Sequence, residues 1–167
     1  MQRVRMGNMQ MHSLSRIATA VHTVHCGPAW HGPSLRDVLE DVNAQQAAER
    51  PFSNAHNIWE LVAHLTAWLE FTRRRLEGES FDVTLRMDWP DMPEPSEEAW
   101  QATLEALWTA ETRFHDVTVR IDESRADDPF EGDFPTALYL AIDGVGAHAA
   151  YHGGQIALLK KLVQGPA

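Results

Sequence analysis

The chain has 167 residues, which is enough for one domain whose hydrophobic core needs no disulfide or metal to fold. Its 24 acidic and 14 basic side chains give a formal net charge of −10, which repels phosphate backbones and anionic lipids, so we expect neither a nucleic-acid nor a membrane partner. No stretch reaches about 18 uncharged apolar residues, and the N-terminus lacks an apolar run of signal-peptide length, so we expect a soluble, unprocessed chain.

Two helical patterns occupy the N-terminal third. Residues 13–26 repeat apolar side chains at steps of three and four, which predicts a helix that ends before Gly27-Pro28. Ser34 followed by Asp37 resembles a capping box and predicts a second helix, from Ser34 until Pro51 stops it. The single cysteine, Cys26, cannot form an internal disulfide, so we expect a small buried side chain in a cytoplasmic protein.

The rest of the chain alternates long helices with irregular connections. Asn57 and Glu60 form a second capping-box pattern and predict a helix over 57–76. Residues 78–95 contain three prolines and no sustained period, which predicts a crossing loop that rims a cleft. A third long helix is predicted over 96–123, and Pro135 suits the first position of a last helix that ends at Gly165.

These elements predict an all-α fold, because no convincing strand alternation or internal repeat is present. Three long helices and one interrupted N-terminal helix suit an antiparallel four-helix bundle. We expect a single domain overall, in which residues 1–33 form an N-terminal helix and connecting segment that packs on a bundle built from 34–167.

The last helix contains HAAYHGGQIALLKKL, residues 148–162, which places two histidines on its apolar stripe. His148 and His152 are four residues apart and therefore leave the same face about 6 Å from each other. His64 lies near the apolar face of the helix over 57–76, between Val62 and Leu65. A divalent ion can satisfy three buried imidazoles together and keep a vacant fourth position, so the sequence predicts a three-histidine metal site. The alternative is that each histidine is a hydrogen-bonded core residue.

Other histidines compete as ligands. His22 and His25 form an i,i+3 pair, but His22 falls off the apolar stripe of its helix. His56 lies at a helix entrance, which makes it a weaker candidate. Glu60 lies one turn before His64 and can orient it, although its capping position already explains it.

Two polar residues near the histidine pair are candidate ligand-binding groups. Tyr151 and Gln155 can bond a ligand or a second imidazole nitrogen, or they can be ordinary interfacial residues. Four glycines surround the pair although glycine weakens a helix by about 1 kcal/mol relative to alanine, and we interpret them as sites of tight helix packing: Gly144, Gly146, Gly153 and Gly154.

The two histidine segments, HNIWELVAHLTAW (56–68) and HAAYHGGQIALLKKL, resemble the motifs aHl and HxxxHxGQi of the DinB-like superfamily over roughly residues 30 to 163. The resemblance implies a four-helix bundle that binds a divalent metal through His64, His148 and His152, and it implies a homodimer. Imidazole ligands suit Zn²⁺, Ni²⁺, Mn²⁺ and Fe²⁺, and the sequence does not choose among them.

Characterised members of that superfamily include metal-dependent S-transferases that use bacillithiol or mycothiol, and a thiol-dependent maleylpyruvate isomerase. By resemblance, the partners of this chain are a low-molecular-weight thiol and a small-molecule electrophile, and Tyr151 and Gln155 are the candidate cofactor-binding residues. No catalytic side chain is assigned. The alternatives are a hydrolase that uses metal-bound hydroxide, with Glu60 as its candidate base, and a stress-response metal-binding protein without turnover.

Overall fold

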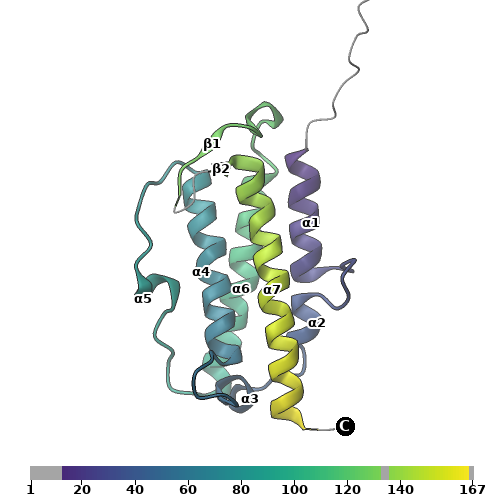
Figure 1. Ribbon diagram of the computed structural model, residues 1–167, viewed down its shortest axis with the longest axis vertical. Coiled ribbons are helices and arrows are strands. Elements are labelled where there is room, and N and C mark those ends of the chain that lie inside the picture. Colours follow the sequence, from purple (N-terminus) through teal and green to yellow (C-terminus); the bar gives the residue numbers. More distant parts are fainter. Residues whose placement is uncertain (1–12, 133–135, 166–167) are drawn as a thin grey trace, which may run out of the picture.

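Four helices form a bundle in the computed structural model, which describes residues 13–132 and 136–165 (Figure 1). They are α1 (Leu14–Cys26), α4 (Ile58–Leu76), α6 (Glu97–Thr118) and α7 (Leu138–Gln164). Helices α1 and α7 run in one direction and α4 and α6 in the other. Because α1 and α4 each contact both α6 and α7, every helix has one parallel and one antiparallel neighbour. The prediction of an all-α four-helix bundle is confirmed.

Helix α4 begins where its capping box predicts. The Asn57 side chain accepts a hydrogen bond from the Glu60 backbone N–H at 2.9 Å, and a Glu60 carboxylate oxygen accepts one from the Asn57 N–H at 3.1 Å. These two bonds satisfy N–H groups that the first turn of a helix leaves without partners. The apolar stripe of α4 is buried, so His64 on that stripe faces α7.

The prediction of one helix between Ser34 and Pro51 is wrong, because the segment folds as α2 (Leu35–Leu39) and α3 (Ala44–Ala48). Ser34 caps α2 as predicted. The break falls at Asn43, whose extended backbone allows its side chain to accept from the Gln46 N–H at 3.0 Å. A capping residue cannot itself be helical, so the capping box of Asn43 and Gln46 divides the segment into two helices. Glu97 of α6 reinforces the break by accepting from the Ala44 N–H at 3.0 Å.

The connection between α4 and α6 crosses the outside of the bundle and contains the short helix α5 (Leu85–Asp88) (Figure 1). Helix α6 ends at Thr118, earlier than the predicted Glu123. A 3₁₀ turn, η1 (Glu123–Arg125), follows it. Two strands too short to show alternation in the sequence, β1 (Pro129–Phe130) and β2 (Thr136–Ala137), then pair antiparallel with Pro129 opposite Ala137. The predicted helix start at Pro135 lies outside the described residues.

The hydrophobic core runs along the bundle axis. Trp59 and Trp100 are buried and meet edge to face with ring centroids 5.2 Å apart, and Trp100 Nε1 donates to the Val42 carbonyl at 2.6 Å. At Gly146, a Cβ atom would lie 3.1 Å from a methyl group of Val21, so glycine allows α7 to approach α1 closely, as the sequence predicted for this position. No helix within 13–132 and 136–165 has the length and apolar character needed to cross a membrane.

Candidate metal centre

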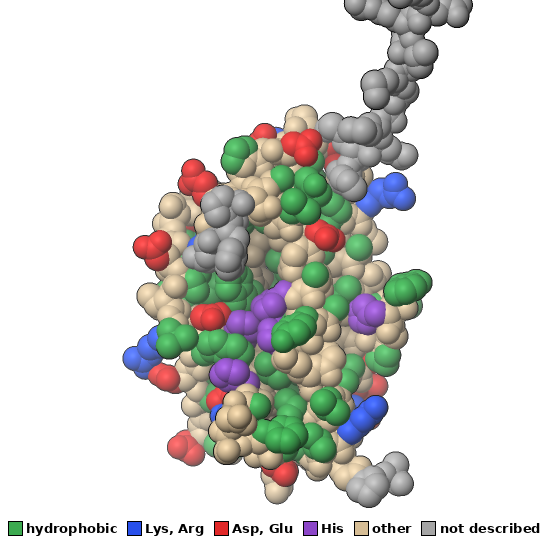
Figure 2. Space-filling model, in the orientation of Figure 1, with side chains coloured by type: hydrophobic (Ala, Val, Ile, Leu, Met, Phe, Trp, Pro, Cys, Tyr) green, Lys and Arg blue, Asp and Glu red, His purple; other side chains and the backbone are tan. Residues whose placement is uncertain are grey.

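Three imidazoles from two helices converge in the bundle. His64 of α4 and His148 of α7 bring their Nε2 atoms within 3.0 Å of each other. His152 follows His148 by one turn, and one ring nitrogen from each of the three residues lies within 4.8 Å of the other two. Histidine side chains gather at the centre of one face over α4 and α7, beside a hollow lined by hydrophobic side chains (Figure 2).

Neighbouring oxygen atoms orient two of the three rings. His64 Nδ1 lies 2.9 Å from the Asp88 carbonyl oxygen and 3.0 Å from the Asp88 carboxylate. His152 Nδ1 lies 2.7 Å from the amide oxygen of Gln155. Because these oxygens only accept, each Nδ1 is the protonated nitrogen, and the Nε2 lone pairs of His64 and His152 remain for a ligand. The rings are therefore in the tautomer that binds a metal.

Burial keeps the histidine pair on α7 neutral. Burial, together with the nearby imidazoles of His152 and His64, lowers the pKa of His148 to about 4. Burial also lowers the pKa of His152, against the opposing effect of its hydrogen bond to Gln155. Because only a neutral imidazole has a free lone pair, both side chains are ready to bind a cation at neutral pH.

Two tryptophans hold the loop that carries Asp88 against α4. Trp68 Nε1 donates to the Asp88 carboxylate at 2.7 Å. The Trp89 ring lies between two imidazoles, stacked on His64 with centroids 4.0 Å apart and on His56 at 3.5 Å. The prediction that residues 78–95 rim a cleft is confirmed, since Asp88 both contacts His64 and lines the adjacent cavity.

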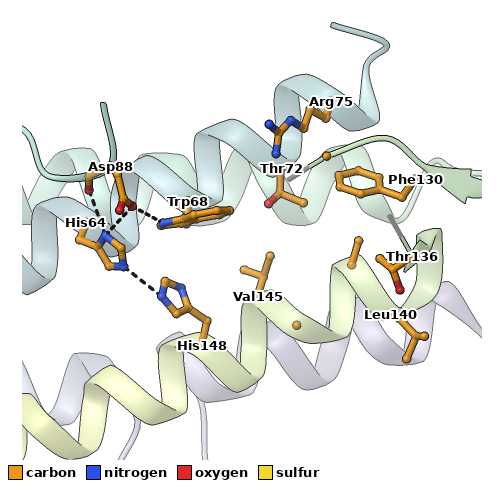
Figure 3. A pocket seen from close by; sticks show the side chains of 13 residues that line it. His64, Trp68, Thr72, Arg75, Asp88, Phe130, Thr136, Leu140, Val145 and His148 are labelled. Carbon is orange, nitrogen blue, oxygen red and sulfur yellow. Dashed lines mark hydrogen bonds and ion pairs between the residues drawn. The ribbon is translucent and has the colours of Figure 1, made fainter. Parts of the chain in front are cut away.

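A cavity of about 520 Å³ opens directly onto His64 and His148, between α4 and α7 (Figure 3). This volume is in the range of small-molecule sites. Its walls are mostly apolar, and Arg75 lies at the end away from the histidines. The lining residues are His64, Trp68, Thr72, Arg75, Asp88, Phe130, Gly132, Thr136, Leu140, Ala141, Gly144, Val145 and His148.

The family model described as the DinB superfamily matches residues 30–156, a span that contains all three converging histidines. The chain belongs to the DinB superfamily. Searches of curated proteins and of solved structures found no match.

The side chains of this DinB-superfamily protein suit a divalent cation. Three imidazoles present ring nitrogens to one point, two of them are oriented through their second nitrogen, and the cavity leaves room for a further ligand. Without an ion, the same nitrogens are close enough for His148 and His64 to share a hydrogen bond. This donor set agrees with the family assignment and with the predicted trio.

The other residues that the sequence offered as candidates do not belong to the converging trio. Glu60 does not orient His64; it bonds Asn57, His56 and Arg50. His56 packs on Trp89 outside the trio. Tyr151 is 65 % exposed, and its ring meets the edge of His152 at 4.9 Å.

Helix α1 holds two further candidate histidines, His22 and His25, and the cysteine. His25 is completely buried, and His22 contacts Glu111 of α6. Cys26 is half-buried, so the prediction of a buried side chain is wrong; it lies at the α1–α6 interface beside Glu111 and Arg36.

Sequence reasoning missed Asp88 and Trp89 as parts of the site. Both lie in a connection without helical or strand periodicity, where no pattern predicts which side chain faces the bundle. The only available indication was the unusual content of aromatic residues and methionine in a loop of polar composition.

Proposed function

We propose that this protein is a metal-dependent thiol S-transferase. In this proposal His64, His148 and His152 bind a divalent cation which, when bound, keeps the sulfur of a low-molecular-weight thiol such as bacillithiol or mycothiol ionised at neutral pH. One observation carries the proposal: His64 and His148 belong to the converging trio and are also walls of the cavity. A small molecule in that cavity therefore lies next to the cation site.

The transfer itself is a nucleophilic substitution. The thiol sulfur forms a bond to an electrophilic carbon, the leaving group departs with its bonding electron pair, and the thiol proton passes to solvent. We assign no catalytic side chain to this step, because positioning of the two reactants next to each other supplies much of the acceleration. The contribution of the chain is to orient the imidazoles through Asp88 and Gln155 and to exclude water with apolar walls.

The shape of the cavity favours a particular pair of reactants. Trp68, Val145 and Leu140 offer apolar surface for the body of the electrophile. Arg75 closes the far end of the cavity, eleven residues from His64 on α4, and its guanidinium donates to the Phe81 carbonyl at 3.1 Å. Gln155 and Tyr151 flank His152 and remain the proposed contacts for the thiol cofactor.

Hydrolysis is supported less well than thiol transfer. A hydrolase needs a general base beside the water to be activated. Glu60 was the candidate, but it is paired with Arg50 and bonded to His56, and it lines a different, smaller cavity with Trp89. The contacts of Glu60 therefore favour thiol transfer over hydrolysis as the proposed function.

The test uses protein purified without a histidine tag. Its metal content is measured first, and the protein is then incubated with bacillithiol, mycothiol or glutathione and a chlorobimane electrophile. Metal-dependent conjugation above the uncatalysed rate, lost in His148→Ala and retained in the exposed control His31→Ala, supports the proposal. Metal-dependent cleavage of esters or amides without conjugation would replace it with hydrolysis, and absence of both activities would leave a metal-binding protein.

We also propose that the protein is a homodimer through α7. Tyr151, Leu158 and Leu162 follow one another at steps of seven and four on this helix and are largely exposed. Burial of such a stripe against its copy removes apolar area from water. Sedimentation velocity should show a dimer that Leu158→Arg converts to a monomer; an unchanged mass would place the interface elsewhere.

A further inference from the structure

A second group of ligand-type side chains lies on the opposite antiparallel helix pair, α1 and α6. His22 and Cys26 are one turn apart on α1, and Glu111 faces them from α6. One donor atom from each of the three residues lies within 4.8 Å of the others. His22 Nδ1 is 2.8 Å from one Glu111 carboxylate oxygen, and Cys26 Sγ is 4.0 Å from the other.

The carboxylate of Glu111 lacks a permanent cation. Only 2 % of the residue is exposed, and within the described part of the chain it has no lysine or arginine at ion-pair distance. Arg36 of α2 bonds instead to Cys26 Sγ at 3.5 Å and packs over Trp108. Burial of an ionised carboxylate is costly unless a cation offsets it. Among the described residues, His22 is the base that forms an ion-pair contact with Glu111, and its side chain is 46 % exposed.

The interior next to this cluster also contains a buried polar side chain, that of His25. His25, the neighbour of Cys26 in the chain, is completely buried. Its Nδ1 donates to the Val21 carbonyl at 2.9 Å, whereas its Nε2 has no hydrogen-bond partner among the described residues. Since burial disfavours the charged form of histidine, His25 does not supply the missing positive charge.

We infer that His22, Cys26 and Glu111 form a second metal site, specific for a thiophilic divalent cation of the Zn²⁺ type. Thiolate, imidazole and carboxylate are the three ligand types that zinc accepts, and a soft sulfur ligand disfavours Mg²⁺ and Ca²⁺. Two anionic ligands neutralise the charge of the ion, and the thiol proton of Cys26 is released to solvent on binding. The ion would join α1 to α6.

A fourth ligand is available on α6. His115 follows Glu111 by one helical turn, and its ring centroid lies 5.4 Å from that of His22. Both helices therefore present a ligand pair with i,i+4 spacing to the same interface: His22 with Cys26, and Glu111 with His115. A water molecule completes a four-coordinate site if His115 remains outside it.

Cobalt titration separates this site from the three-histidine centre. Cys26 is the only cysteine in the chain, so any sulfur-to-cobalt charge-transfer absorption must come from it, and the histidine trio cannot produce this absorption. The titration is made in the His148→Ala background, which disables the first site. We expect a charge-transfer band that saturates at one equivalent of Co²⁺, displacement of the cobalt by Zn²⁺, and protection of Cys26 from maleimide by Zn²⁺.

Two variants test the ligands without disturbing the core. Cys26→Ser should abolish the charge-transfer band, and His22→Ala, at a half-exposed position, should weaken cobalt binding by at least about tenfold, because even the loss of a group that orients a ligand costs about 10- to 100-fold. The control His31→Ala should leave binding unchanged. A cobalt spectrum without the sulfur band, or maleimide labelling of Cys26 at the same rate with and without Zn²⁺, would overturn the inference. Because the proposed transferase depends on the other site, either proposal can fail while the other stands.

Discussion

The Nε2 atoms of His64 and His148 lie 3.0 Å apart, although 84 positions separate the two residues in the chain. Two unprotonated nitrogens repel at this distance, so one ring must donate to the other or both must share a cation. The orientation of His64 by Asp88 makes His148 the donor when no ion is present. A metal that binds His148 through Nε2 therefore requires the proton of this neutral ring to move to Nδ1.

Removal of one imidazole should empty the three-histidine centre. In His148→Ala we expect loss of most of the metal bound there and of the stabilisation that binding supplies, which is about 2.7 kcal/mol when the free metal is at 100 times its dissociation constant. Elemental analysis and thermal unfolding with and without added metal measure both effects. His31→Ala, at an exposed position, is the control. Full retention of metal by a His148→Ala, Cys26→Ser double variant would exclude His148 from the ligand set.

The Asp88 side chain should tune metal affinity without contacting the ion. Asp88→Ala removes one acceptor of His64 Nδ1–H and the acceptor of Trp68 Nε1, while the Asp88 carbonyl oxygen still contacts His64. We therefore expect affinity to fall by about tenfold, the lower end of the range for such orienting groups. Competition with a chromogenic chelator measures it. Asp91→Ala in the same loop, at a side chain that is 73 % exposed, should bind metal as the wild type does.

The proposed use of the cavity predicts a steric effect at Gly144. This residue lines the cavity, and a Cβ atom there would meet no atom within 4 Å. Gly144→Met should place a flexible side chain at the opening and raise the KM for a bulky electrophile, with metal content unchanged. Gly154→Met is the matched control, because a Cβ atom at Gly154 also meets no atom within 4 Å and this glycine of α7 does not line the cavity. Replacement of either glycine should stabilise the helix by a similar amount, up to about 1 kcal/mol. Equal kinetics in the two variants would show that the electrophile binds elsewhere.

The Glu123 carboxylate should make stability depend on pH. Backbone N–H groups of Leu14 and Ser15 donate to it at 2.6 and 3.2 Å and hold the pKa of that carboxyl below its usual range. A folded-state pKa below the unfolded one means that the stabilisation is complete above the unfolded pKa and is lost as the pH falls through the folded pKa. Glu123→Gln should therefore lower the urea midpoint at neutral pH, and the difference from wild type should shrink below about pH 4.

The exposed residue Asp127 in the same connection supplies the control for this measurement. Asp127→Asn should leave the urea midpoint close to that of wild type at every pH. A Glu123→Gln variant with an unchanged midpoint at neutral pH would mean that solvent caps the first turn of α1 equally well.

Local features of the sequence determined the helices and the histidine trio. Capping boxes and apolar steps of three and four act between residues that are close in the chain, so α4 and the pair His148 and His152 could be placed by inspection. The inward direction of His64 followed from the same periodicity. Local rules also produced an error: one helix was predicted from Ser34 to Pro51, whereas Asn43 caps a second, separate helix within this segment.

Only the tertiary structure decided which distant side chains meet. Asp88 contacts His64 from a connection without periodicity. Glu111 of α6 contacts His22 and Cys26 of α1, which lie 89 and 85 positions earlier in the chain. Nothing in the spacing of these residues indicates the contacts, because the packing of helices sets them through the rotation and shift of each helix against its neighbour. The sequence therefore determined which helices exist and which of their faces are buried, while the packing created the oriented imidazoles, the adjoining cavity and the second group of ligands.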